Sequence, residues 1–169
     1  MSIAQSLLPE FDHEMANTRK AIERVPDGKF SWKPHTRSND MGWLANHLSN
    51  LPLWLTVTLS SQELDMNPPG GSNITLPKGS NQAEVLANFD KAVADARAAL
   101  EKVSDADLMK PWTFLNAGTT IFTMPRVAVV RSFVMNHIIH HRGQLTVYLR
   151  LNDLPVPSLY GPSADEGRS

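Results

Sequence analysis

The chain has 169 residues, of which 41% are hydrophobic and 20% are charged, and this composition is typical of a globular protein with one domain, residues 1–169. Its formal net charge of −1, without a basic block, argues against nucleic acid or an anionic membrane surface as a partner. The chain contains no cysteine, which excludes disulfides, thiolate metal ligands and a cysteine nucleophile.

Two segments with the periodicity of amphipathic helices come first. Residues 3–24 carry apolar side chains at spacings of three and four, and the turn sequence PDG after Val25 ends this helix. The second helix is expected over residues 39–64, with Ser38 or Asn39 as its candidate N-cap. The loop sequence MNPPGGSN then follows.

The third and fourth helices are separated by a long connection. The third helix, residues 81–103, is rich in alanine, which favours the helical state. Within the connection, residues 113–123 allow short strands. The fourth helix is expected over residues 125–152, because Pro125 suits the first helical turn. Four long helices in one small domain predict an all-α four-helix bundle, followed by an irregular tail at residues 153–169.

Two features of the sequence bear on localisation. No uncharged apolar run approaches the ~20 residues that a membrane-spanning helix needs. The first residues, MSIAQSLLPEFDHE, lack the basic segment and long apolar core of a secretory signal. We therefore expect a cytoplasmic protein.

The stretch MNHIIHHRGQL places three histidines within five residues of the fourth helix. At ~100° per residue, His141 lies in the apolar stripe of that helix, His137 about 40° from it, and His140 about 100° away. Only His137 and His141, one turn apart, project side by side into the core, a spacing that suits two imidazoles on one cation. His47, near the centre of the apolar stripe of the second helix, is the best third ligand.

Two interpretations of these three histidines stay open on the residues alone. They form either a hydrogen-bonded polar network in the core or a mononuclear metal site. Burying three imidazoles without partners is unfavourable, and one divalent cation satisfies them together. Ile138 stands where the zinc-protease motif H-E-x-x-H has its glutamate, so that motif is absent. Three neutral ligands favour an anionic further ligand, hydroxide or thiolate, on zinc, nickel, iron or copper.

Other side chains near this site are candidates for supporting roles. Trp43, one turn from His47, is the candidate for lining a pocket, with packing in the core as the alternative. Candidate catalytic or ligand-supporting residues are Asp40, Tyr148 and Gln144, with helix capping by Asp40 and packing by Tyr148 as alternatives. The arginines of the fourth helix are expected to be solvated or paired with carboxylates: Arg131, Arg142 and Arg150.

The segments RSFVMNHIIHHRGQLTVYLRLNDLPVPSLYGPSADE and GWLANHLSNLPLWLTVTL closely resemble the DinB (DinB/YfiT-like) superfamily, and the resemblance extends over nearly the whole chain. It implies a four-helix bundle of up-down-down-up topology that holds a divalent metal ion with three histidines. One ligand comes from the second helix and two come from an H-x-x-x-H pair on the fourth. In this sequence these positions are His47, His137 and His141.

The resemblance also implies classes of function. Characterised relatives include transferases that use bacillithiol and a mycothiol-dependent maleylpyruvate isomerase. The first expectation is a metal-dependent S-transferase that acts on a small-molecule thiol and an electrophilic substrate, uses zinc, nickel or iron, and forms a homodimer. A hydrolase with metal-bound hydroxide is the second expectation. A non-enzymatic, stress-related metal-binding bundle is the third.

Overall fold

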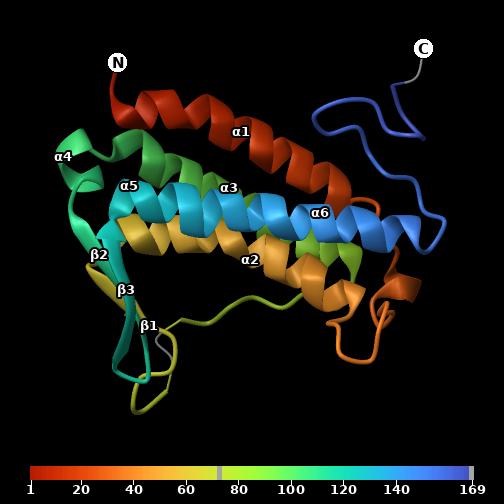
Figure 1. The fold of residues 1–169 in the computed structure, drawn as a ribbon, viewed down its shortest axis with the longest axis horizontal. Helices are drawn as coiled ribbons and strands as arrows, with labels where there is room; N and C mark the ends of the chain where they lie inside the picture. Colours follow the sequence, from red (N-terminus) through yellow and green to blue (C-terminus); the bar gives the residue numbers. More distant parts are fainter. Residues whose placement is uncertain (72–73, 168–169) are drawn as a thin grey trace.

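A computed structural model describes residues 1–71 and 74–167. Within these residues, four long helical segments lie side by side (Figure 1). They are α1 (Ile3–Ile22), α2 (Met41–Ser60), α3 (Gln82–Lys102), and a last segment formed by α5 (Arg126–Ala128), the π-helix η2 (Val129–Met135) and α6 (Asn136–Arg150). Each segment lies within the range that the sequence predicts.

The four long segments pack as a bundle. Both α1 and α2 pack against α3 and α6. In Figure 1, α1 and α6 run from left to right, whereas α2 and α3 run from right to left. Two short helices lie in the connections, the 3-10 helix η1 (Asp27–Lys29) and α4 (Asp105–Leu108). No helix in the described part of the chain combines the length and apolar character needed to cross a membrane.

Hydrogen-bonding side chains fix the starts of α1 and α2. Ser2 caps α1, and Gln5 completes a capping box with it. The N-cap of α2 is Asp40, whose Oδ1 accepts a hydrogen bond from the Trp43 backbone N–H at 2.7 Å. The expected cap at Ser38 or Asn39 is therefore wrong by one or two residues. Capping sets the start of α2 and hence the position of His47 two turns later.

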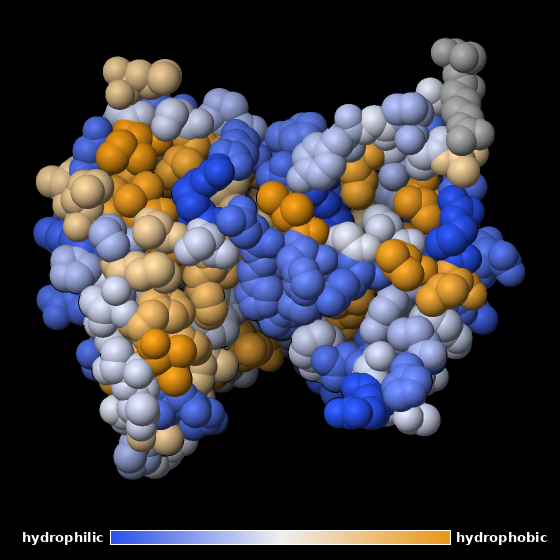
Figure 2. All heavy atoms as spheres, in the orientation of Figure 1, coloured by the Kyte–Doolittle hydropathy of each residue, from blue (hydrophilic) through white to orange (hydrophobic). Residues whose placement is uncertain are grey.

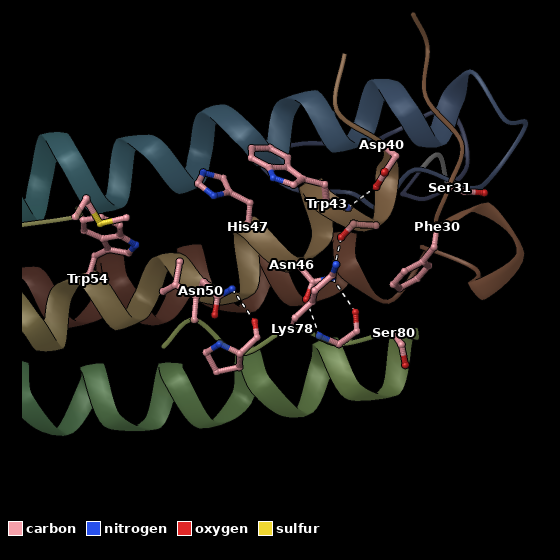
Figure 3. Close-up of a pocket in the computed structure, with 15 residues that line it drawn as sticks. Phe30, Ser31, Asp40, Trp43, Asn46, His47, Asn50, Trp54, Lys78 and Ser80 are labelled. Atoms are coloured by element: carbon pink, nitrogen blue, oxygen red, sulfur yellow. Dashed lines mark hydrogen bonds between the residues drawn. The ribbon is translucent and has the colours of Figure 1, made fainter. Parts of the chain in front are cut away.

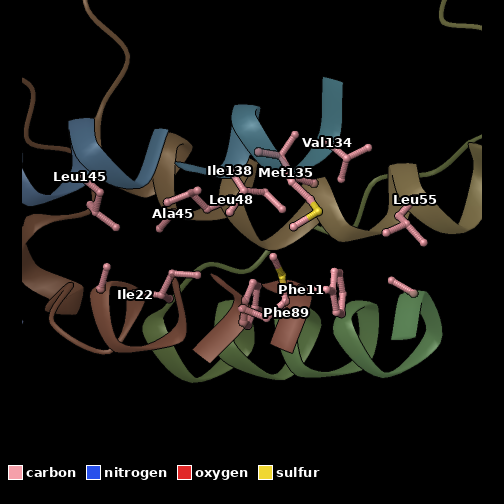
Figure 4. Close-up of a cluster of buried hydrophobic side chains, with 14 of the residues drawn as sticks. Phe11, Ile22, Ala45, Leu48, Leu55, Phe89, Val134, Met135, Ile138 and Leu145 are labelled. Atoms are coloured by element: carbon pink, nitrogen blue, oxygen red, sulfur yellow. The ribbon is translucent and has the colours of Figure 1, made fainter. Parts of the chain in front are cut away.

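The hydrophobic core lies between the four long segments. Figure 4 shows side chains of opposite helices pointing toward one another, with Phe11 and Phe89 on one side and Met135 and Ile138 on the other. All four side chains are buried. The apolar stripes that the sequence predicts thus meet in one cluster, and their burial is the main stabilising contribution to the bundle.

A small sheet at one end of the bundle corrects the all-α prediction. In the described residues it has three strands, β1 (Glu63–Asp65), β2 (Pro111–Asn116) and β3 (Thr119–Pro125), with β1 parallel and β3 antiparallel to β2. Ala117 and Gly118 have φ angles of 49° and 75°, as in the type I′ turn that suits a hairpin. The Asp65 carboxylate accepts hydrogen bonds from both backbone N–H groups of this turn. The short strands that the sequence allows at residues 113–123 are thus present as β2 and β3, whereas β1 and its non-local pairing with β2 were not expected.

Aromatic side chains join the sheet to the bundle. Trp112 of β2 is fully buried, and its neighbour on the strand, Phe114, contacts Trp54 of α2 and Phe133 of η2. The ring centroids of Trp54 and Phe133 are 5.5 Å apart, and Phe133 lies 5.9 Å from His137. The sheet therefore supports the part of the helices from which the histidines project.

The fourth segment is not a uniform α-helix. Val129–Met135 forms a π-helix, and α6 starts at Asn136, one residue before His137. A π-helical stretch widens the turn through i→i+5 hydrogen bonds and is frequent at functional sites. It changes the angular relation between residues before and after it. An angle calculated for a uniform helix across this segment is therefore approximate.

Two helical glycines lead to opposite expectations for stability. A Cβ on Gly42 would lie 2.7 Å from Phe30 Cδ1 and 3.0 Å from the Phe30 carbonyl oxygen, whereas nothing lies within 4 Å of one on Gly143. Gly42→Ala should lower the free energy of unfolding by about 1–3 kcal/mol, because it overpacks this contact. Gly143→Ala should raise it by about 0.5–1 kcal/mol through helix propensity. Urea unfolding measures both, and effects of the same sign would contradict the expectation.

Candidate metal centre

Three histidine rings from α2 and α6 lie against one another. Ring nitrogens of His47, His137 and His141 all lie within 4.8 Å of one another. The Nε2 atoms of His47 and His137 are 3.3 Å apart. The ring centroid of His141 lies 4.5 Å from that of His47 and 4.7 Å from that of His137. The structure thus brings together the three side chains that the sequence predicts as ligands.

The spacing of the His47 and His137 nitrogens fits a bound cation. Two histidine nitrogens that bind one tetrahedral zinc ion lie roughly 3.3 Å apart, because each Zn–N bond is about 2.0–2.1 Å long. A hydrogen bond between His47 and His137 would involve only two of the three rings, whereas one cation can bind all three. The cluster contains no carboxylate within the described residues. Its donor set is therefore three imidazoles, which suits a divalent transition metal.

The protonation of the rings also suits ligation. Burial, with the neighbouring His141 and His137 rings, lowers the pKa of His47 to about 4. Burial lowers the pKa of His137 as well, although its bond to the Phe133 backbone opposes the change. Burial likewise lowers the pKa of His141, against the bond to Gln144. At neutral pH the rings are consequently uncharged and offer lone pairs to a cation.

Two hydrogen bonds orient the α6 histidines. Nδ1 of His141 lies 2.7 Å from Oε1 of Gln144, which can only accept, so Nδ1 donates and Nε2 keeps its lone pair. Gln144 Nε2 lies 3.0 Å from Nε2 of His140, which is exposed and outside the cluster. A ring nitrogen of His137 bonds the Phe133 backbone one turn earlier. Gln144 therefore holds a candidate ligand in place.

The remaining candidate catalytic residues have structural contacts of their own. Asp40 caps α2 through the Trp43 N–H. The Tyr148 hydroxyl donates to the Asn39 carbonyl oxygen at 3.2 Å, and its ring packs edge-on against Trp32. Within the described residues, neither Asp40 nor Tyr148 makes a hydrogen bond to the three histidines. Asp40 and Tyr148 each line a cavity beside the cluster, and they contribute to the site in this way.

Two cavities meet at the histidine cluster. The larger cavity, of about 650 Å³, lies along α2 and the loop at residues 76–80 and is lined by His47 (Figure 3). The smaller cavity, of about 480 Å³, lies between α6 and the connection at residues 34–39 and is lined by His141. Trp43 lines both cavities. Figure 2 shows that this face of the molecule is hollowed between the sheet and the opposite end of the bundle.

Two asparagines on either side of His47 form a wall of the larger cavity. The Asn46 side chain bonds both the N–H and the carbonyl of Gly79, and Asn50 Nδ2 donates to the Pro77 carbonyl at 2.9 Å (Figure 3). Both asparagines are buried. Neither asparagine is among the residues that the sequence predicts at the site, although two amides one turn apart in a largely apolar helix are a usable signal, since buried amides need partners.

Comparison with known proteins identifies the family. The sequence profile of the DinB family matches residues 1–168. The chain belongs to the DinB family. An uncharacterized protein of Bacillus subtilis (strain 168), YrdA, is 50% identical over 34 residues, which cover 20% of this DinB chain and 20% of that protein.

Solved structures of DinB-like proteins share the fold of this DinB chain. A DinB-like protein from Bacillus cereus ATCC 10987 has a TM-score of 0.72 at 23% identity, over 94% of this chain and 98% of that one. The DinB-like protein YjoA from Bacillus subtilis has a TM-score of 0.69 at 18% identity, over 91% and 97% of the two chains. YfiT from Bacillus subtilis, described as a probable metal-dependent hydrolase with an unusual four-helix bundle topology, has a TM-score of 0.62 at 15% identity, over 89% and 87%.

Proposed function

We propose that this DinB protein is a metal-dependent S-transferase that joins a low-molecular-weight thiol to a small electrophile. The observation that carries the proposal is the convergence of three neutral imidazoles, His47, His137 and His141, without a carboxylate in the cluster. This donor set leaves the full charge of a divalent cation to be balanced by an anionic ligand. A divalent cation held by these histidines would lower the pKa of a coordinated thiol and so favour the thiolate, which is the nucleophile.

The residues of the chain have three tasks in such a reaction. The histidines hold the cation, and Gln144 fixes the ring of His141. The cavities on either side of Trp43 bring the two reactants to the same point, which lowers the entropic part of the barrier. The thiol sulfur forms the new S–C bond, the leaving group departs with the electron pair of the bond that breaks, and the thiol proton passes to solvent.

A hydrolase is the second candidate. It is favoured by the fold shared with YfiT, which is described as a probable metal-dependent hydrolase. Hydrolysis needs a group that takes a proton from the attacking water, commonly a carboxylate or a histidine. The cluster contains no carboxylate within the described residues, and its three histidines are the candidate ligands. The S-transferase needs no such base, because a thiol ionises far more readily than water, and we prefer it for this reason.

A turnover assay distinguishes these functions. Protein purified without an affinity tag is mixed with 1-chloro-2,4-dinitrobenzene and, in turn, cysteine, glutathione, bacillithiol or mycothiol, and thioether formation is followed by absorbance. We expect at least one thiol to react faster than without protein. His47→Ala should remove the acceleration because it removes a candidate ligand. His140→Ala, which removes an exposed histidine of α6 outside the cluster, is the control and should keep it.

Three further measurements on the same protein, of ester hydrolysis, metal content and stability, can reject the S-transferase. Ester hydrolysis without a thiol, lost in His47→Ala, would favour the hydrolase. Protein that purifies without metal, and whose stability does not change when a chelator is added, would favour a non-enzymatic bundle. The identity of the metal follows from elemental analysis of the active protein, with zinc, nickel and iron as the expected ions.

A further inference from the structure

The two cavities beside the histidine cluster differ in the side chains that line them. The larger cavity is walled mainly by apolar and aromatic groups, which include Trp43, Trp54, Met66 and Leu76. The smaller cavity has more polar groups for its size, which include Arg37, Ser38, Asn39 and Gln144. The two cavities therefore offer different environments to a ligand.

Trp43 separates the two cavities. Its indole stacks on His47, with the ring centroids 4.7 Å apart and an interplanar angle of 12°, and it meets His141 edge-on at 6.3 Å. It is 43% exposed, so it lies in the hollow and outside the core. Figure 3 shows Trp43 beside His47 on the same face of α2. A cation held by the histidines is therefore approached along His47 from one cavity and along His141 from the other.

The charges in the two cavities also differ. In the larger cavity, Asp40 and Lys78 have opposite charges that offset each other. In the smaller cavity, Arg37 is the one lining residue with a permanent charge. Among the described residues, no carboxylate lies within 4.0 Å of the Arg37 guanidinium. An arginine without a partner is suited to binding a carboxylate of a ligand through two parallel hydrogen bonds.

We infer that each cavity serves one reactant and that the thiol is anionic. The smaller cavity holds a thiol that carries a carboxylate, with the carboxylate on Arg37 and the sulfur directed past His141 to the cation. The larger cavity holds an apolar, preferably aromatic, electrophile beside Trp43 and His47. This inference rests on the proposed S-transferase function, and it names the class of each substrate and the residue that selects the thiol.

A pair of thiols matched in size tests the role of Arg37. Binding of 3-mercaptopropionate and of its neutral amide, 3-mercaptopropionamide, is measured by titration calorimetry on the whole protein with its metal bound. Arg37 is exposed, so wild type should bind the acid about fivefold more tightly, as expected for an ion pair at a solvent-exposed site. Arg37→Ala should remove this preference. Lys33→Ala, a nearby exposed cation outside both cavities, should keep it.

The larger cavity is tested with 2-naphthol as a neutral aromatic probe. Leu76→Ala should weaken its binding about threefold, because less apolar surface is buried against it. Leu151→Ala, exposed and outside both cavities, should have no effect. Saturating 3-mercaptopropionate should leave the affinity for 2-naphthol unchanged.

Three results would overturn the inference: equal affinities of wild type for the acid and the amide, a preference that persists in Arg37→Ala, or competition between the thiol and 2-naphthol. Since these are binding measurements, they are independent of turnover. Separate binding of both probes, together with no thioether formation in the turnover assay with 1-chloro-2,4-dinitrobenzene, would reject the S-transferase and retain the two subsites.

Discussion

Alanine in place of His47 or His141 is expected to lower the affinity for the divalent metal by at least about a hundredfold, more than the loss of a residue that only orients a ligand. Either substitution leaves two imidazoles, which are too few to compete with water for the ion. Elemental analysis of protein purified without an affinity tag should find about one ion per chain in wild type and little in either variant. The ion should also stabilise wild type by about 2.7 kcal/mol when its free concentration is a hundred times the Kd.

Variants of α6 provide a graded set of controls. Gln144→Ala removes the group that accepts the His141 Nδ1–H, so its metal affinity should fall by about 10–100-fold while the three imidazoles remain. His140→Ala removes an exposed ring outside the cluster and should retain the metal. Equal metal in His47→Ala and wild type would show that the rings form a polar network without an ion.

The positions of the histidines could be predicted from the sequence because they depend on local periodicity. His137 and His141 are one turn apart, and His47 lies in the apolar stripe of α2, so the three rings come together once α2 packs against α6. The rings are half-buried beside the core, whereas the prediction placed them in it. The same reasoning gave the four long helical segments. It also gave Trp43, one turn from His47, as the candidate for lining a pocket, and this half-exposed side chain lines both cavities.

Features that depend on contacts distant in sequence could not be predicted in this way. The pairing of β1 with β2 joins residues about fifty positions apart, and the capping of the hairpin turn by Asp65 has no local signal. No glycine or proline marks the π-helix at residues 129–135. The bonds of Asn46 to Gly79 required knowledge of where the loop lies. Helical periodicity in the sequence thus predicted the candidate ligands, whereas the residues that form the cavity walls could be identified only from the folded structure.

Glu14 illustrates a signal that was available in the sequence. It lies three residues after Phe11 and four before Thr18, on the apolar stripe of α1, and a charged residue at such a position needs a partner. The structure supplies one in Arg142, which was expected to be solvated or paired. Its Nη2 lies 2.6 Å from Glu14 Oε2, and the two side chains are only 1% and 6% exposed.

Arg142→Met is expected to lower the free energy of unfolding by about 3–5 kcal/mol, because it leaves the Glu14 carboxylate buried without its counter-charge. Arg142 also donates to the Glu14 carbonyl and the Thr18 hydroxyl, and the Tyr160 hydroxyl donates to Glu14 from the C-terminal tail. The pair therefore joins α1, α6 and the tail. Urea unfolding followed by circular dichroism measures the effect.

The double variant Glu14→Leu with Arg142→Met separates the value of the pair from the cost of an unpaired charge. Replacing both partners by apolar side chains leaves no buried charge, so it should destabilise the protein much less than Arg142→Met alone. Arg150→Met, which breaks the exposed pair with Asp165, is the matched control and should cost at most about 1 kcal/mol. If Arg142→Met cost no more than Arg150→Met, the buried pair would not be what fastens the tail and α1 to α6.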